Sequence, residues 1–244
     1  MTKCFLTFIL FLAATFVKAQ IKLEQKDFDN LIAIGELYSH NTNARGEKFA
    51  KGRDYLAEIK KNSGRYKIED AGINSKYSDY GPAYMGTKVI FTSARDTGNF
   101  SKRIHTWTGQ YFTNLYSSAL GEDGGLTGVD KFGKKINTKY HEGPAALLPD
   151  GTLMFTRNNY FKGKAKKSAE GIIKLKLFTA TAPGLDEVKP FPYNSDEYSV
   201  GHPALNSTGT LLIFASDMPG GLGGTDLYYC TRASVKEEWG KPVN

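Results

Sequence analysis

Three apolar runs of one form are spaced along the chain, and each ends in phenylalanine. They are Val89-Ile90-Phe91, Leu153-Met154-Phe155 and Leu211-Leu212-Ile213-Phe214. Their residues are almost continuously apolar instead of alternating with polar ones, which is typical of a strand covered on both faces. The pattern therefore predicts three inner strands of stacked sheets.

Each run belongs to a longer phrase that begins with Pro-Ala. The prolines are Pro82, Pro144 and Pro203, which lie 62 and then 59 residues apart. A recurrence at such a period indicates a repeat architecture. Because proline fixes φ and has no amide hydrogen to donate, we expect it at the first residue of a strand or at a sheet edge.

A short polar or glycine-containing turn separates each Pro-Ala pair from its apolar run. These turns are Tyr84-Met85-Gly86, Pro149-Asp150-Gly151 and Asn206-Ser207-Thr208-Gly209. Asp-Gly between apolar runs is a strong hairpin signal because the turn requires positive φ. Each copy thus predicts an antiparallel pair of strands.

A third strand is predicted in every copy after a polar, basic or glycine-rich loop, over residues 114–119, 176–181 and 226–231. The shared Leu-Tyr or Leu-Phe pair recurs at intervals of 62 and 50 residues, so the insertions fall in loops. With a less regular outer strand, each copy forms a four-stranded blade, and a β-propeller is the simplest architecture. The fold class we expect is mainly β: a partial propeller of about three blades, preceded by a short helical hairpin.

The two ends of the chain complete this division into segments. Residues 1–19 have the basic, apolar and small-residue regions of a signal peptide, with cleavage before Gln20. Apolar residues at helical spacing predict two helices within 20–71, and 72–244 form the propeller segment. Residues 239–244 look like the linker and opening strand of a fourth blade, so we expect a fragment of a longer protein with an unpaired sheet edge.

Charge and cysteine content narrow the class of protein further. The full chain has 32 Lys and Arg against 25 Asp and Glu, and removing Lys3 and Lys18 with the signal lowers the net charge from +7 to +5. Basic clusters lie over 51–67 and 162–167, and we expect solvated surface or contact with acidic envelope polymers, with no nucleic acid partner. Cys4 leaves with the signal, so Cys230 has no disulfide partner, and its apolar strand predicts a buried, inert thiol.

The glycine-rich segment Ser216–Tyr228 resembles the signature of TolB-type, WD-repeat-like propeller blades. The segments 72–79, 103–107 and 140–144 resemble the propeller region of OmpA-family envelope proteins of Bacteroidetes type. The similarity extends from about Gly72 to the end of the chain. The repeat signature consists of Pro82, Phe91, Pro144, Asp150, Gly151, Phe155, Pro203, Phe214, Asp217, Gly221, Gly224 and Asp226.

This resemblance implies a location in the periplasm at the outer membrane, with envelope proteins or a peptidoglycan-associated complex as partners. It also implies a longer parent protein that ends in an OmpA-like domain, which this chain lacks, so no peptidoglycan-binding residue is assigned. No transmembrane segment is expected after cleavage of the signal.

The residues with catalytic potential do not form a recognisable set in the sequence. Gly220–Gly224 precedes a strand, which favours an inter-strand turn over a phosphate loop. The four histidines show no zinc spacing, and we expect them to be hydrogen-bonded loop residues. The carboxylates Asp79, Glu142, Asp217 and Asp226 occupy different repeat positions, so no convergent acid and base are expected.

We therefore expect a non-catalytic scaffold or binding module, with no catalytic residue, cofactor or metal. Tyr77, Tyr80, Trp107, Tyr111 and Phe112 cluster around the first copy, where inter-blade packing competes with a sugar- or peptide-binding surface. Two alternatives remain open: a propeller hydrolase acting on glycosides or peptides, and a soluble carbohydrate-binding protein.

Overall fold

The computed structural model describes Lys61 and residues 69–95, 104–106 and 108–244. The chain divides into two compact units, 1–69 and 70–244. The signal segment 1–19 lies outside the described residues, and so does the expected helical segment 20–71 apart from Lys61, which is helical, and residues 69–71. The second unit is mainly β, as predicted, and it is built from antiparallel sheets.

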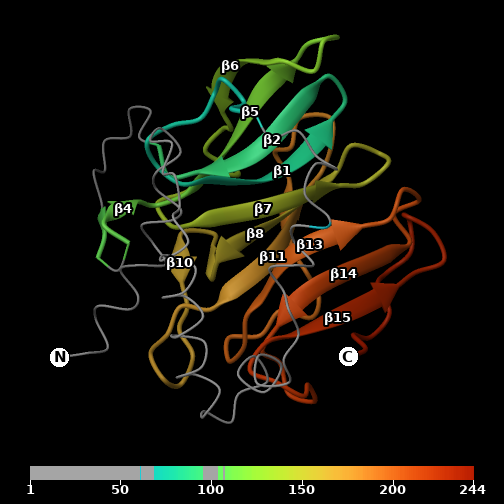
Figure 1. Ribbon diagram of the computed structural model, residues 1–244. Helices are drawn as coiled ribbons and strands as arrows, with labels where there is room; N and C mark the ends of the chain where they lie inside the picture. Colours follow the sequence, from blue (N-terminus) through green and yellow to red (C-terminus); the bar gives the residue numbers. More distant parts are fainter. Residues whose placement is uncertain (1–60, 62–68, 96–103, 107) are drawn as a thin grey trace. The chain divides into compact units, whose positions relative to one another are not determined.

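Three antiparallel sheets make up most of the second unit (Figure 1). The first has the order β1 (Asp79–Met85), β2 (Lys88–Ser93), β5 (Asn114–Leu120) and β6 (Leu126–Lys131). The second has the order β7 (Glu142–Leu147), β8 (Leu153–Asn158), β11 (Leu175–Ala180) and β12 (Val188–Pro190). The third has the order β13 (Val200–Leu205), β14 (Leu211–Ser216) and β15 (Asp226–Thr231).

Two small hairpins complete the described strands. One pairs β3 (Ile104–His105) with β4 (Gln110–Tyr111), and the other pairs β9 (Tyr160–Phe161) with β10 (Lys164–Ala165). Figure 1 shows β4 and β10 on the same side of the three sheets. Each hairpin lies in the connection between the second and third strands of its sheet.

The repeat phenylalanines occupy equivalent places in the three sheets. Phe91, Phe155 and Phe214 lie in the second strands β2, β8 and β14. Their partners across the ladder are the aromatic residues of the third strands, Tyr116, Phe178 and Tyr228. The turn glycines Gly86, Gly151 and Gly209 all have positive φ, which glycine adopts without steric cost.

The repeat prolines lie at a bulge in the first strand of each sheet, and this strand is the sheet edge in every case. The pairing register shifts around Pro82, Pro144 and Pro203 in the same way. A bulge leaves one residue outside the ladder, so it accommodates a residue that cannot donate a hydrogen bond. The expectation of an edge position agrees with this, whereas proline is not the first residue of any of these strands.

The first strands of the sheets lie next to one another, because β7 contacts both β1 and β13. Thr156 of β8 links two of them. Its hydroxyl accepts a hydrogen bond from His202 N–H at 2.9 Å and donates one to the carbonyl oxygen of Pro144 at 3.3 Å. A Cβ at Gly201 would lie 3.0 Å from Thr156, so glycine permits this close approach.

Two hydrophobic clusters fill the spaces between neighbouring sheets. Between the first and second sheets lie Ile90, Leu115, Ile136, Ala145, Leu153, Phe155, Phe178 and Ala180. Between the second and third lie Met154, Leu177, Phe191, Val200, Leu212, Phe214, Tyr228, Cys230 and Trp239. The second sheet thus contributes to both clusters, and β8 is buried on both faces, as its apolar run predicted.

The third sheet departs from the prediction that its apolar run is covered on both faces. Ile213 is 39% exposed, whereas its repeat equivalents Ile90 and Met154 are fully buried. Leu227 is 70% exposed, although its equivalents in the other sheets are also fully buried. Because a neighbouring sheet covers these positions only in the first two copies, the same apolar pattern leads to different burial.

The C-terminal segment was predicted to open a fourth blade, and that prediction is wrong. Trp239 is buried in the cluster between the second and third sheets. Val243 forms an isolated antiparallel bridge with Tyr229 of β15, so this segment adds to the outer edge of the third sheet. The third sheet accordingly has three strands and a bridge in place of the expected four strands.

Candidate functional site at the loop rim

The described functional side chains gather at the end of the sheets where the first strands begin. We call this end the loop rim. In the described chain it includes the linkers 132–141 and 191–199 and the loops 159–174 and 217–225. Loops on a rigid scaffold are where binding and catalytic groups are generally placed.

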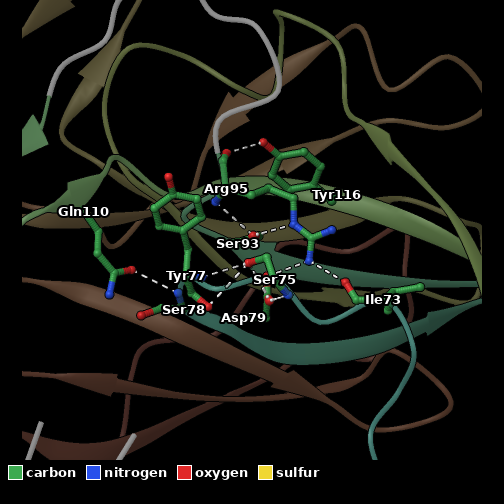
Figure 2. A network of polar contacts seen from close by, with 9 residues as sticks. All are labelled: Ile73, Ser75, Tyr77, Ser78, Asp79, Ser93, Arg95, Gln110 and Tyr116. Atoms are coloured by element: carbon green, nitrogen blue, oxygen red, sulfur yellow. Dashed lines mark hydrogen bonds and ion pairs between the residues drawn. The ribbon is translucent and has the colours of Figure 1, made fainter. Parts of the chain in front are cut away.

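An ion pair joins the first two strands of the first sheet at this rim (Figure 2). Arg95 Nη2 lies 2.8 Å from Asp79 Oδ1. The same nitrogen donates a hydrogen bond to the carbonyl oxygen of Ile73 at 2.8 Å, and Arg95 Nε donates to Ser93 Oγ at 2.9 Å. We call this arrangement the first clip, because it fastens the segment before β1 to the end of β2.

The second carboxylate oxygen of Asp79 is also occupied. Ser75 donates to Asp79 Oδ2 from its backbone N–H at 2.6 Å and from its hydroxyl at 2.8 Å. Burial raises the pKa of Asp79, but hydrogen bonds from Ser93, Arg95 and Ser75 outweigh that effect, so the pKa lies below its ordinary value of 3.8. Asp79 is therefore a fixed anion in a structural contact.

A second clip stands at the corresponding place in the second sheet. Arg157 Nε lies 3.3 Å from Glu142 Oε1, and the two side chains are 3% and 0% exposed. Arg157 Nη2 donates to the carbonyl oxygens of Ile136 at 2.6 Å and Lys135 at 2.9 Å, both in the preceding linker. The two clips therefore perform the same local task in consecutive copies.

Burial sets the second clip apart electrostatically. Burial raises the pKa of Glu142 to about 7, although a hydrogen bond from Thr138 and the charge of Arg157 act in the opposite direction. Thr138 Oγ1 donates to Glu142 Oε1 at 2.7 Å, whereas Oε2 has no hydrogen-bond partner in the described part of the chain. An incompletely solvated carboxylate of this kind binds a proton more readily than an exposed one.

Both clip arginines also stack on the aromatic pair that connects the second and third strands. Arg95 lies over Phe91 at 5.1 Å and over Tyr116 at 5.6 Å from the ring centroids. In the second sheet Arg157 lies at 5.0 and 4.9 Å from the centroids of Phe155 and Phe178. This cation–π contact places the charge above the repeat phenylalanine in each case.

The third sheet has no such ion pair at the equivalent strand positions, which are Val200 and Ser216. Ser216 Oγ instead donates to the carbonyl oxygen of Ser199 at 2.6 Å. The neighbouring Asp217 accepts a hydrogen bond from Ser199 N–H and pairs with Lys174 at 3.1 Å. Burial raises the pKa of Asp217, but these two partners outweigh it and hold the pKa below its ordinary value.

Asp226, the fourth candidate carboxylate, holds the glycine-rich loop. Its Oδ2 accepts a hydrogen bond from Gly223 N–H at 2.9 Å. A Cβ at Gly221 would collide with the Asp226 carboxylate, which explains the glycine at that position. Within the described chain the four carboxylates thus fasten separate segments of separate copies, and the structure does not bring them to one point.

Two histidines meet at the rim beside the first sheet. The rings of His105 and His141 lie 4.8 Å apart, and Phe112 lies 4.4 Å from His141. Thr113 N–H donates to His141 Nδ1 at 3.1 Å, so the neutral ring carries its proton on Nε2. Burial and the nearby His105 lower the pKa of His141 to about 4, so this ring is neutral near pH 7.

Aromatic side chains predicted to cluster near the first copy are only partly brought together. Tyr77 and Tyr111 pack edge to face at 5.6 Å. Tyr80 is 42% exposed on β1, and Trp107 lies outside the described residues. A second aromatic pair, Tyr140 and Tyr160 at 4.9 Å, was not singled out from the sequence.

The remaining side chains considered from the sequence are structural. Cys230 is buried, and burial raises the pKa of its thiol to about 11, which agrees with the predicted inert cysteine. The described residues contain no group of three or more His, Cys, Asp or Glu placed to bind a metal ion. Among these same residues, no helix has the length and apolar character needed to span a membrane.

The clip arginines are the functional-looking residues that the sequence reasoning missed. A signal was present, because Arg95 and Arg157 each follow the repeat phenylalanine within a few residues. An acidic residue also precedes the repeat proline in both copies, at Asp79 and Glu142. The offsets differ between copies, so the pairing becomes evident only when the strands are aligned by register.

No family model matches the chain, and no curated protein matches it. A solved structure described as a glycoside hydrolase matches with a TM-score of 0.39 and 12% identity, covering 67% of this chain and 55% of that chain. One described as a complex of BT0996 with RGII matches with a TM-score of 0.40 and 12% identity, covering 67% and 54%. A puromycin hydrolase matches with a TM-score of 0.30 and 13% identity, covering 68% and 30%.

The chain thus spans about half the length of the first two of these structures and less than a third of the other. At such TM-scores and identities the similarity carries no argument about activity. Function must be argued from the loop rim itself.

Proposed function

We propose that the three sheets are consecutive blades of an incomplete β-propeller that serves as a non-catalytic binding or scaffold module of the cell envelope. The repeated strand order, with the first strands β1, β7 and β13 adjacent, supports the propeller geometry. In such a geometry the loops of successive blades share one rim, where they can present side chains to a partner.

The observation that carries the non-catalytic proposal is the use made of the carboxylates. Asp79, Glu142 and Asp217 each bind a cation and a loop or linker donor of their own copy or its neighbour. A general acid and base must instead converge on one substrate atom within hydrogen-bond reach. Side chains committed to fastening loops favour a rigid platform over a reaction centre.

The envelope location is proposed from the sequence. The N-terminal signal pattern and the resemblance to TolB-type propellers of OmpA-family proteins support export to the periplasm and association with the outer membrane. In this proposal the chain is the propeller part of a longer peptidoglycan-associated protein, and its partners are envelope proteins.

Two measurements on the full chain test this proposal. Cell fractionation should place the protein in the periplasmic and outer-membrane fractions, with the mature chain beginning at Gln20. Purified protein should not turn over glycoside or peptide substrates. A cytoplasmic location would contradict the envelope role, and hydrolysis that disappears in Glu142→Gln or Asp217→Asn would contradict the non-catalytic role.

A further inference from the structure

The positive charge of the loop rim is concentrated on the second sheet. The linker 132–141 and the loop 159–174 together contain eight lysines and one glutamate. The corresponding segments of the third sheet, 191–199 and 217–225, contain three acidic residues and no lysine or arginine. Because these segments are repeat equivalents, the contrast is a property of the second copy and does not follow from the fold.

These two basic segments lie together in space. His141 N–H donates to the Asn158 side chain at 3.0 Å, and the Tyr140 and Tyr160 rings lie 4.9 Å apart. Lys139 of the linker lies over both rings, at 5.7 and 5.5 Å from their centroids. The linker and the loop therefore form one surface, which we call the lysine strip.

Most of the charge on the lysine strip is not neutralised by neighbouring acids. Lys166 pairs with Asp196 at 3.5 Å, and Lys174 pairs with Asp217. The other lysines are exposed and have no ion pair among the described residues: Lys134, Lys135, Lys139, Lys162, Lys164 and Lys167. Several like charges held on one short hairpin and its adjacent linker create a positive potential that attracts an anionic partner.

We propose that the lysine strip binds an anionic polysaccharide, with lysine ammonium groups paired to the carboxylates or phosphates of the sugar chain. This inference rests on the proposed non-catalytic binding role and names one class of partner for it. Lysine suits such a polymer because its ammonium group is a flexible point charge that needs no fixed bidentate partner. A narrow, flexible chain can follow a strip that is confined to one blade.

The structure favours this partner over nucleic acid. Single-stranded nucleic acid is generally held by open aromatic faces on which bases stack. Tyr140 and Tyr160 are half-buried, and Lys139 covers both rings. A duplex extending across the rim would also meet the acidic segment that contains Asp196 and Glu197.

An anionic membrane fits less well for a related reason. Peripheral membrane segments combine basic residues with large apolar side chains that enter the interface. The tip of the β9–β10 hairpin is Lys162-Gly163, and the exposed residues beside it are lysines. A flat surface would also contact the uncharged and acidic loops of the third sheet.

The test compares two triple variants of the full chain that carry the same change in net charge. Lys162→Glu, Lys164→Glu and Lys167→Glu reverse charge on the strip, whereas Lys88→Glu, Lys236→Glu and Lys241→Glu do so at exposed sites elsewhere. Binding is measured by titration calorimetry with alginate, uncharged dextran, single-stranded DNA and phosphatidylglycerol vesicles. Thermal unfolding of each variant verifies that the fold is retained.

We expect the unmodified chain to bind alginate and not dextran, with affinity that falls at least about tenfold between roughly 50 and 200 mM salt. The strip variant should lose about tenfold or more in affinity, and the control variant should bind as the unmodified chain does. Equal losses in both variants, no alginate binding, or tighter binding to DNA or vesicles would overturn the inference. None of these results bears on envelope location or on the absence of turnover, so failure here leaves the proposed function to its own test.

Discussion

The second and third sheets are copies of one repeat, yet they differ in how they are covered and fastened. The second sheet lies between two hydrophobic clusters and closes at the rim with a buried Glu142–Arg157 pair. The third sheet contributes to one of the two clusters, leaves Ile213 exposed, and has Val200 and Ser216 at the clip positions. The first sheet has a clip of its own, Asp79–Arg95, with more solvent contact.

The comparison separates what the repeat requires from what the neighbourhood adds. All three sheets keep the proline bulge, the turn glycine and the aromatic pair across the second and third strands. The ion pair and full burial vary from copy to copy. The strand framework is therefore the constant part of the repeat, and the rim is the variable part on which function can be placed.

The largest effect should follow from breaking the buried clip. Arg157→Met leaves Glu142 buried without its cation, and we expect the free energy of unfolding to fall by about 3–5 kcal/mol. The loss should be smaller when Glu142 can take up a proton, that is, below its folded pKa of about 7. Urea denaturation above and below that pH measures both effects.

Arg95→Met is the matched control for this variant. The first clip keeps some solvent contact, and its carboxylate has further hydrogen bonds from Ser75, so we expect a loss of about 1.5–3 kcal/mol. Equal losses in the two variants would show that burial does not distinguish the clips.

A second pair of variants compares covered and open faces of the sheets. Met154→Ala removes a fully buried side chain between the second and third sheets, and we expect a cost of about 2–5 kcal/mol. Ile213→Ala changes the equivalent residue on the open face, where we expect about 1 kcal/mol or less. Chemical denaturation of both variants tests the comparison, and similar costs would contradict the exposure of the third sheet.

The two clips should respond to pH in opposite ways. Glu142 has a folded pKa of about 7 against an ordinary value of 4.5, so the folded state binds more protons between these values and stability falls as pH rises. Asp79 has a lowered pKa, so its contribution is present above 3.8 and is lost as pH falls through the folded pKa.

Substitution of each acid should remove its own part of this profile. Glu142→Gln should flatten the dependence of unfolding free energy on pH between about 4.5 and 7. Asp79→Asn should leave that window unchanged and reduce the loss of stability in acid. An unchanged slope in Glu142→Gln would show that the carboxylate titrates normally.

The smallest effect concerns the tyrosine hydroxyls that close the first and third sheets. Tyr116 donates to the carbonyl oxygen of Arg95 at 2.8 Å, and Tyr228 donates to that of Met218 at 2.9 Å. Tyr116→Phe and Tyr228→Phe should each cost about 1 kcal/mol. Tyr229→Phe, on the exposed face, is the control and should leave the thermal midpoint unchanged.

Much of the strand framework could be predicted from the sequence, because apolar runs and turn glycines are local signals. The strands that contain Phe91, Phe155 and Phe214 follow from such runs, and the loop before Asp226 follows from its glycines. The position of Trp239 could not be predicted in the same way. A Trp-Gly-Lys-Pro pattern fits either an outer strand or a linker, and tertiary packing decided between them.

The clips and the open face depend on spatial neighbours that a linear pattern does not reveal. Glu142 and Arg157 are partners because the β7–β8 register places them opposite each other around a bulge. Ile213 and Met154 occupy the same place in their copies, and their different burial depends on whether another sheet lies alongside. Charge contrasts such as the lysine strip are visible in the sequence, but their importance emerges only when the loops are aligned on a common rim.

Amide hydrogen exchange of the full chain, resolved to the segments 88–93, 153–158 and 211–216, tests the central claim most directly. If these segments are the equivalent second strands of three sibling sheets, each is hydrogen-bonded on both sides, and all three should be strongly protected. The loops 159–174 and 217–225 should exchange much faster. Rapid exchange of any one of the three strand segments, at a rate like that of the loops, would contradict the repeat-sheet account.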